Sequence, residues 1–264
     1  MPNLDRSCPA ANARRLCLAV FLILMTGAAA ASAQIAPTVS PYYARNNTFS
    51  VFGAYSNDSS RMLLGNAENR KLLDFGVAYG RKLYLNHIVN WQYSGEILPV
   101  ALESDPVVHS VFNQTSPTVQ SWTANVVQAA ACVSKSGSYS DTLTTPSGSI
   151  TFSATYVITC RRQWTIGEAI SPVGFQWNFR PRHKLQPFFI GHGGYMYSTQ
   201  PIPIPEAGSF NFTFDLGSGF ELYRSKTRSV RAEYRYHHLS NHNTANQNPG
   251  VDNGLVQLTY SFGR

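Results

Sequence analysis

The chain has 264 residues, of which 43% are hydrophobic and only 13% are charged, and its formal net charge is +7. The basic residues are scattered and form no block of the kind that nucleic-acid-binding proteins carry, so the composition argues against a nucleic-acid partner. A chain of this length fits one β-barrel or β-sandwich and gives no reason to expect a second folded domain.

Residues 1–33 have the features of a secretory signal peptide. A pair of arginines provides the positive start, residues 16–30 form an apolar core too short to span a bilayer as a helix, and Ala-Ser-Ala at 31–33 provides a cleavage site. We therefore expect a bacterial export product that begins near Gln34. Of the 21 basic and 14 acidic residues, three and one lie in this segment, which leaves 18 and 13. That modest excess suits an anionic lipid surface.

Two of the four cysteines, Cys8 and Cys17, would be lost with the signal peptide. The exported chain then retains Cys132 and Cys160. A lone cysteine pair in an oxidising compartment usually forms a disulfide. We predict that these two residues form a structural disulfide across the long connection and have no redox or metal-binding role.

Residues 34–264 read as one all-β domain, because charge is low, aromatics are frequent and hydrophobicity alternates with a period of two. No later stretch is long and apolar enough for a membrane helix. Eight alternating runs predict eight antiparallel strands, at 48–55, 72–83, 88–98, 166–179, 187–197, 210–223, 229–240 and 254–262.

The alternation favours a membrane barrel over a soluble sandwich. In residues 210–223, phenylalanine and leucine share one parity, while Asn211, Asp215, Glu221 and glycines share the other. A dry sandwich core could not readily hold so many carboxylates, whereas a transmembrane barrel places apolar residues toward lipid and polar residues in the lumen. The sequence therefore predicts an eight-stranded antiparallel transmembrane β-barrel of the bacterial outer membrane.

The connections between the predicted strands alternate between long and short, as in outer-membrane barrels with external loops and periplasmic turns. The longest, 99–165, is expected to be an external loop or insert that carries both cysteines after the third strand. Its alternating piece, 149–159, fits either an added hairpin strand or an extension of the barrel wall. With both termini periplasmic, the strand at 229–240 ends at the outer leaflet.

The segment 234–254 contains the residues best suited to catalysis. By parity, His237 belongs to the lumen, whereas His238 and Ser240 lie on the lipid-side face, where polar groups are costly. Neighbours two apart on a strand stand about 6 to 7 Å from each other, within reach for an imidazole and a hydroxyl. Extrapolated parity also turns Asp252 outward on the adjacent strand. The three residues are expected to converge on one exterior patch.

Chemistry assigns roles within this patch. Ser240 would be the nucleophile, His238 the general base and Asp252 the group that orients the imidazole. Donors for the oxyanion, or groups that position the substrate, are sought at Asn241, at Asn248 and in the backbone around Gly250. A metal site at His237, His238 and His242 is disfavoured because the first two face opposite sides of the strand, and no cofactor is expected.

At this point the sequence resembles a known family. His238-Leu239-Ser240-Asn241, followed by Asn248-Pro249-Gly250-Val251-Asp252, is similar to the signature of PagL-type lipid A 3-O-deacylases, also called acyloxyacyl hydrolase-like. In that family an acid, usually Glu, follows fourteen positions after the histidine. Here the acid is Asp, one methylene shorter. The resemblance implies hydrolysis of the 3-O-linked acyl chain of lipid A, or lipopolysaccharide, within the outer leaflet and without a metal.

A second class of function stays open from the residues alone. A non-enzymatic eight-stranded barrel could have a structural or adhesion role, with His238 and Ser240 as interfacial polar residues beside an aromatic girdle. Side chains fill the interior of so small a barrel, which disfavours a wide pore. Whether two copies associate as a homodimer is left open by the sequence.

Overall fold

The computed structural model describes residues 40–264, and the predicted signal peptide at 1–33 lies outside this range. The described part contains ten antiparallel strands, two more than predicted. They are β1 (Asn47–Ser56), β2 (Lys71–Leu85), β3 (Val89–Ser116), β4 (Gln120–Val127), β5 (Lys135–Thr145), β6 (Gly148–Phe179), β7 (Leu185–Ser198), β8 (Phe210–Tyr223), β9 (Arg228–Ser240) and β10 (Val251–Gly263), with a short 3-10 turn, η2 (Pro205–Ala207), between β7 and β8.

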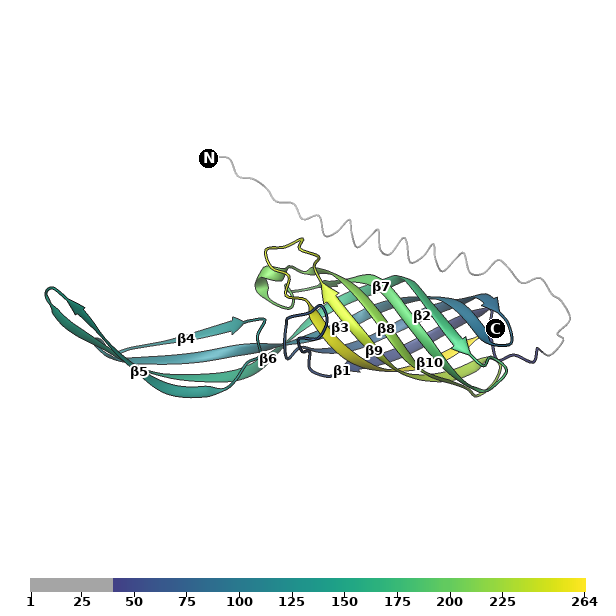
Figure 1. Ribbon diagram of the computed structural model, residues 1–264, viewed down its shortest axis with the longest axis horizontal. Helices are drawn as coiled ribbons and strands as arrows, with labels where there is room; N and C mark the ends of the chain where they lie inside the picture. Colours follow the sequence, from purple (N-terminus) through teal and green to yellow (C-terminus); the bar gives the residue numbers. More distant parts are fainter. Residues whose placement is uncertain (1–39) are drawn as a thin grey trace, which may run out of the picture. The chain divides into compact units, whose positions relative to one another are not determined.

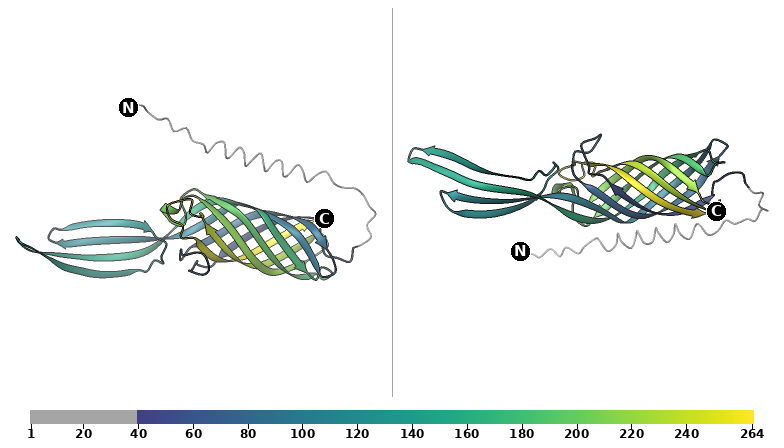
Figure 2. Two further views of the ribbon diagram at one scale, coloured as in Figure 1. Left: turned by 45° about the horizontal axis from the view of Figure 1, so that its top comes forward. Right: turned by 90° about the horizontal axis from the view of Figure 1, so that it is seen from below.

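The sheet closes on itself. Its strand order is β4-β3-β2-β1-β10-β9-β8-β7-β6-β5, and β3 also pairs with β6. This pairing joins β1, β2, β3 and β6 to β10 into a ring, from which β4 and β5 are excluded (Figures 1 and 2). Each strand of the ring pairs with its neighbour in sequence, apart from the β3–β6 and β1–β10 seams. Among residues 40–264, no helix is long and apolar enough to cross a membrane.

Residues 99–165, expected to be an external loop or insert, form an insert that is mostly β-structure. β3 and β6 run on for 28 and 32 residues and stay paired with each other far beyond the ring. β4 pairs with the outer part of β3, and β5 with the outer part of β6, so that two hairpins form a projecting sheet (Figures 1 and 2). Residues 149–159 therefore both extend the wall and form a hairpin with β5. Period-two alternation is weak here, because both faces of the projecting sheet are largely exposed.

The disulfide between Cys132 and Cys160 is present, as predicted. It connects the segment that precedes β5 to the outer part of β6, and the two cysteines have a sequence separation of 28. Together with the β5–β6 pairing it closes the second hairpin of the insert.

The ring has an apolar exterior and a polar interior. Along β10, Val256 and Leu258 are 58% and 62% exposed, whereas Gln257 and Thr259 between them are 1% and 2% exposed. The same alternation runs through β8 and β9. A soluble protein would bury the first set and expose the second, so this distribution is that of a wall between lipid and a polar lumen.

A small apolar cluster fills the lumen at the end from which the insert projects. Its buried members are Ala67, Ala101, Met196, Ile202, Leu239 and Val251. Near this cluster, Arg70 is fully buried. Its Nε donates to Asp105 at 3.2 Å, and its two terminal nitrogens donate to four backbone carbonyls of the surrounding loops. These contacts hold the loops against the open end of the ring, next to the ends of β9 and β10.

Candidate active site

His238 and Asp252 lie opposite each other on β9 and β10, at the end of the ring from which the insert projects. The imidazole Nδ1 and the carboxylate Oδ1 are 2.6 Å apart. Both residues have the outward parity of Val256 and Leu258. The imidazole is 12% exposed and the carboxylate is fully covered. The cross-strand register thus joins the two groups that the sequence analysis placed on one exterior patch.

Asp252 is covered by the loop between β1 and β2, which folds over the outer side of the wall. The backbone amides of Leu63 and Leu64 donate to Oδ2 of Asp252 at 2.8 and 2.9 Å. The same loop is tied to the start of β10 by a parallel bridge between Ala67 and Val251. One carboxylate oxygen therefore binds the loop and the other binds His238. Because both partners favour the charged carboxylate, Asp252 is suited to hold the Nδ1 proton of His238 and to leave Nε2 free to act as a base.

Ser240 follows His238 by two residues on β9, on the same face of the strand, and is partly exposed. It lies opposite Phe212 of β8, while His238 lies opposite Phe214. Strand rise separates Ser240 from His238 by about 6 to 7 Å at the backbone. Among the hydrogen bonds of residues 40–264, none joins the serine hydroxyl to the imidazole. The structure thus joins His238 to Asp252 directly, and places Ser240 beside them.

The loop after β9 is organised by Asn241. Its Nδ2 donates to the carbonyls of Ala207 and Gln247 at 2.5 and 2.7 Å, so both amide hydrogens are used within the loop. Its backbone amide donates to Oδ1 of Asn248 at 3.1 Å. Asn248 is thereby brought next to the residue that follows Ser240. These contacts give Asn241 a positioning role and place the Asn248 side chain near the serine.

Gly250 is buried where this loop enters β10. It has a φ of 60°, in the left-handed region that favours glycine. A Cβ here would lie 3.2 Å from Cε1 of His238 and 3.3 Å from the Cα of Gly65. The glycine therefore lets the loop pass close to the imidazole.

The residues of this patch fall within a region shared with a known family. The sequence model described as lipid A 3-O-deacylase (PagL) matches residues 128–261, which is just over half of the chain and includes His238, Ser240 and Asp252. The chain belongs to the PagL family. A search of curated proteins found no match to it.

Several solved outer-membrane proteins resemble this PagL-family chain at low sequence identity. The crystal structure of the outer membrane enzyme PagL has 11% identity and a TM-score of 0.45, covering 81% of this chain and 99% of that one. Neisserial surface protein A has 8% identity and a TM-score of 0.42, covering 83% and 97%. The outer membrane protein OprG from Pseudomonas aeruginosa has 10% identity and a TM-score of 0.34, covering 83% and 98%.

The loop residues that hold Asp252 were missed by the sequence analysis of this PagL-family chain. Leu63 and Leu64 act through backbone amides, which no side-chain motif reveals. Gly65 is buried against Asp252. The signal that could have found them is the short run Met62-Leu63-Leu64-Gly65 in an otherwise polar connection.

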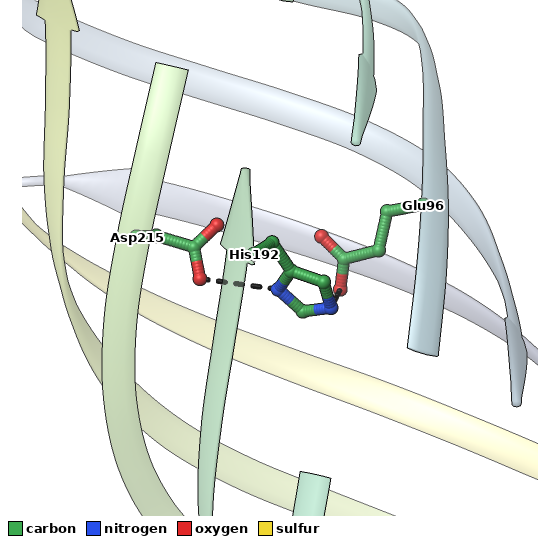
Figure 3. Close-up of side chains that lie close together, drawn as sticks. All are labelled: Glu96, His192 and Asp215. Carbon is green, nitrogen blue, oxygen red and sulfur yellow. Dashed lines mark hydrogen bonds and ion pairs between the residues drawn. The ribbon is translucent and has the colours of Figure 1, made fainter. Parts of the chain in front are cut away.

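A second cluster of titratable groups lies in the lumen, away from the outward-facing patch. Glu96, His192 and Asp215 offer ligand atoms within 4.8 Å of one another, from β3, β7 and β8 (Figure 3). The guanidinium of Arg235 donates to Glu96 at 2.8 Å and lies 3.4 Å from Asp215. Because Arg235 already pairs with both carboxylates, the cluster is best described as an ion-pair network that connects four strands across the lumen.

Proposed function

We propose that this chain is an outer-membrane esterase that hydrolyses the 3-O-linked acyl chain of lipid A. The strands of the closed ring, eight in number, would span the outer membrane, and the projecting insert would lie outside the cell. Export would depend on removal of residues 1–33. The apolar exterior of β8, β9 and β10 supports this placement, because these strands expose phenylalanine, leucine and valine on the outward face.

The observation that carries the proposal is the outward-facing His238–Asp252 pair, 2.6 Å apart, with Ser240 next to it on the same face. A barrel with only a structural role has no need for a covered carboxylate on its lipid-facing side. A substrate embedded in the outer leaflet would approach from that side. The position of the pair near the outer end of β9 suits an ester bond close to the lipid A head group.

The chemistry follows from these positions. The Ser240 hydroxyl would rotate toward Nε2 of His238, lose its proton to that nitrogen and attack the ester carbonyl. The tetrahedral intermediate would collapse with cleavage of the bond to the sugar oxygen, which takes the proton from His238 and leaves as the 3-hydroxyl. Water, deprotonated by His238, would then attack the acyl-serine and release the fatty acid. Asp252 would stabilise the imidazolium in both steps.

The oxyanion of each tetrahedral intermediate needs donors. The Asn248 side chain is the first candidate, because its Oδ1 is fixed on the Asn241 amide and its Nδ2 is then directed away from that bond. Asn241 would keep this loop in place, and Gly250 would let its backbone pass close to His238.

The experiment is a comparison of lipid A from cells with and without this protein, by mass spectrometry. We expect lipid A to lose the mass of one hydroxy fatty acid when the protein is expressed, and to keep it when Ser240→Ala is expressed at an equal level. Identical spectra in all three strains, with folded protein in the outer membrane, would overturn the proposal.

A further inference from the structure

Three consecutive apolar side chains are exposed in the loop between β1 and β2, and we call Met62, Leu63 and Leu64 the apolar tip. They are 55%, 75% and 58% exposed. Single exposed apolar residues are common on protein surfaces, but a continuous group marks a surface that contacts another apolar phase. The rest of the loop is polar, so the apolar tip is a local feature.

The loop that carries the apolar tip is held in a defined shape. Ser59 fastens its base: the hydroxyl donates to the Ala67 carbonyl at 2.7 Å and accepts from the Arg70 amide at 2.9 Å. On the other side, the Asn57 amide donates to the Gly254 carbonyl at 3.1 Å. The apolar tip is therefore exposed on a loop whose base is fixed by hydrogen bonds.

The apolar tip is continuous with the lipid-facing wall of the ring. Its two leucine amides bind the side chain of Asp252, which points outward from β10, so this part of the loop lies against the outer side of the wall. Further along the same face, Val256 and Tyr234 are 58% and 54% exposed. Leu63 and Leu64 thus lie next to the apolar exterior of β9 and β10, at the level of Asp252 near the start of β10.

We propose that the apolar tip inserts among the acyl chains of the outer leaflet and that this contact helps to hold the acid of the active site. The proposal rests on the function above for the membrane around the ring. Leu63 and Leu64 would contact lipid through their side chains and Asp252 through their backbone amides. Lipid that immobilises these side chains would also immobilise their backbone amides. The amides would then fix the orientation of the Asp252 carboxylate, and the carboxylate that of His238.

The first test measures contact with lipid and does not depend on hydrolysis. A nitroxide spin label is attached to Leu63→Cys in protein reconstituted into vesicles of phosphatidylcholine with phosphatidylglycerol. Cys8 and Cys17 lie in the segment proposed to be removed on export, and Cys132 and Cys160 are joined in the disulfide, so the introduced cysteine is the one that is labelled. Labels at Val256→Cys, on the lipid-facing wall, and at Val119→Cys, at the outer end of the insert, are the references. Their parent residues are 58% and 86% exposed.

We expect the label at position 63 to behave like the label at 256, with greater accessibility to dissolved oxygen than to a water-soluble nickel complex. The label at 119 should show the reverse order. A label at 63 that follows the pattern of 119 would overturn the proposal. If neither lipopolysaccharide hydrolysis nor lipid contact is found, both proposals fail. Lipid contact without hydrolysis would contradict the esterase, and with it the link to an active-site acid, and would leave the membrane contact of the apolar tip standing.

The second test measures the link to Asp252. The double variant L63S/L64S keeps both backbone amides but removes the apolar side chains, and Val119→Ser is the matched loss of an exposed apolar residue away from the site. In lipopolysaccharide-containing vesicles the double variant should lose about 10- to 100-fold in hydrolysis, the scale expected when a catalytic group is displaced by about 1 Å. Val119→Ser should retain the parent rate. Equal rates for the double variant and the parent, with both folded, would contradict the link.

Discussion

A Cβ atom at Gly65 would lie 2.7 Å from the backbone nitrogen of Asp252 and 2.9 Å from its Oδ1. Alanine at this position must therefore push the loop away from the carboxylate that binds His238. We expect Gly65→Ala to lower the rate of hydrolysis by about 10- to 100-fold through misplacement of the acid. Initial rates on lipopolysaccharide in detergent provide the measurement.

The matched control for that variant is Gly193→Ala in β7, where an added Cβ meets no atom within 4 Å. This control should keep the parent activity. Because a structural defect alone could lower the activity of Gly65→Ala, the rate is measured over a range of pH. A misplaced Asp252 should also alter the pH profile of the rate, whereas a smaller fraction of folded protein would only scale it.

The length of the acid at position 252 gives a second prediction. The carboxylate is held between His238 Nδ1 at 2.6 Å and the Leu63 and Leu64 amides at 2.8 and 2.9 Å. Glutamate is the usual acid in the PagL-family signature. At position 252 it would add a methylene where the loop already closes on the side chain. Asp252→Glu should therefore be roughly tenfold slower than the parent. Higher activity in this variant would contradict this account, because it would show that the loop leaves room for the longer acid.

Removal of the charge at the same position should have a larger effect. Asp252→Asn keeps the size of the side chain but cannot stabilise the imidazolium, and it can hold His238 in the wrong tautomer. We expect a loss on the order of 10³- to 10⁴-fold in kcat, as found for the equivalent change in other triads. The folded barrel should persist, as judged by heat-modifiable migration in electrophoresis. Loss of that migration would indicate a structural role for the carboxylate instead.

Stability should depend on pH through Asp105, which lies beyond the last residue of β3 that pairs with β2. Burial raises the pKa of its carboxyl from 3.8 to about 6, against the opposing effect of Arg70. The folded state then holds this proton more tightly than the unfolded state. The stabilisation is fully present below the unfolded pKa and is lost as the pH rises through about 6. The protein should therefore gain roughly 1 kcal/mol from this group between about pH 7.5 and about pH 5.

The check is urea unfolding of detergent-solubilised protein at these two pH values. Asp105→Asn has no proton to exchange, so the difference between the two midpoints should shrink by that amount. Groups that do not interact with Asp105 titrate equally in both proteins and cancel in the comparison. An unchanged difference would show that Asp105 does not carry this dependence.

The disulfide should stabilise the insert without affecting the site. Cys132 and Cys160 close a hairpin of the projecting sheet, while His238 and Asp252 lie on strands of the ring. The double variant C132S/C160S should be cut more rapidly by protease between 128 and 160. Hydrolysis and heat-modifiable migration should stay at parent levels. A loss of activity would show that the insert supports the site.

The strands of the ring could be predicted from sequence because lipid and lumen impose opposite polarity on alternate residues. The run predicted at 210–223 coincides with β8, and that at 229–240 differs from β9 by one residue. The segment 99–165 could not be predicted in this way, since its strands are exposed on both faces and alternate poorly. Parity also placed His238 and Asp252 on one face. It gave no information on the loop that covers Asp252, because the contacts there are backbone hydrogen bonds between residues nearly 190 positions apart.

The most direct test of the proposed chemistry is fatty acid release by the purified protein. Parent protein and Ser240→Ala are incubated with lipopolysaccharide in detergent, and the products are quantified by mass spectrometry. The parent should release a 3-hydroxy fatty acid, whereas Ser240→Ala should release none while still migrating as a folded barrel. Equal release by the two proteins, or none from well-folded parent protein, would contradict an active site built on Ser240, His238 and Asp252.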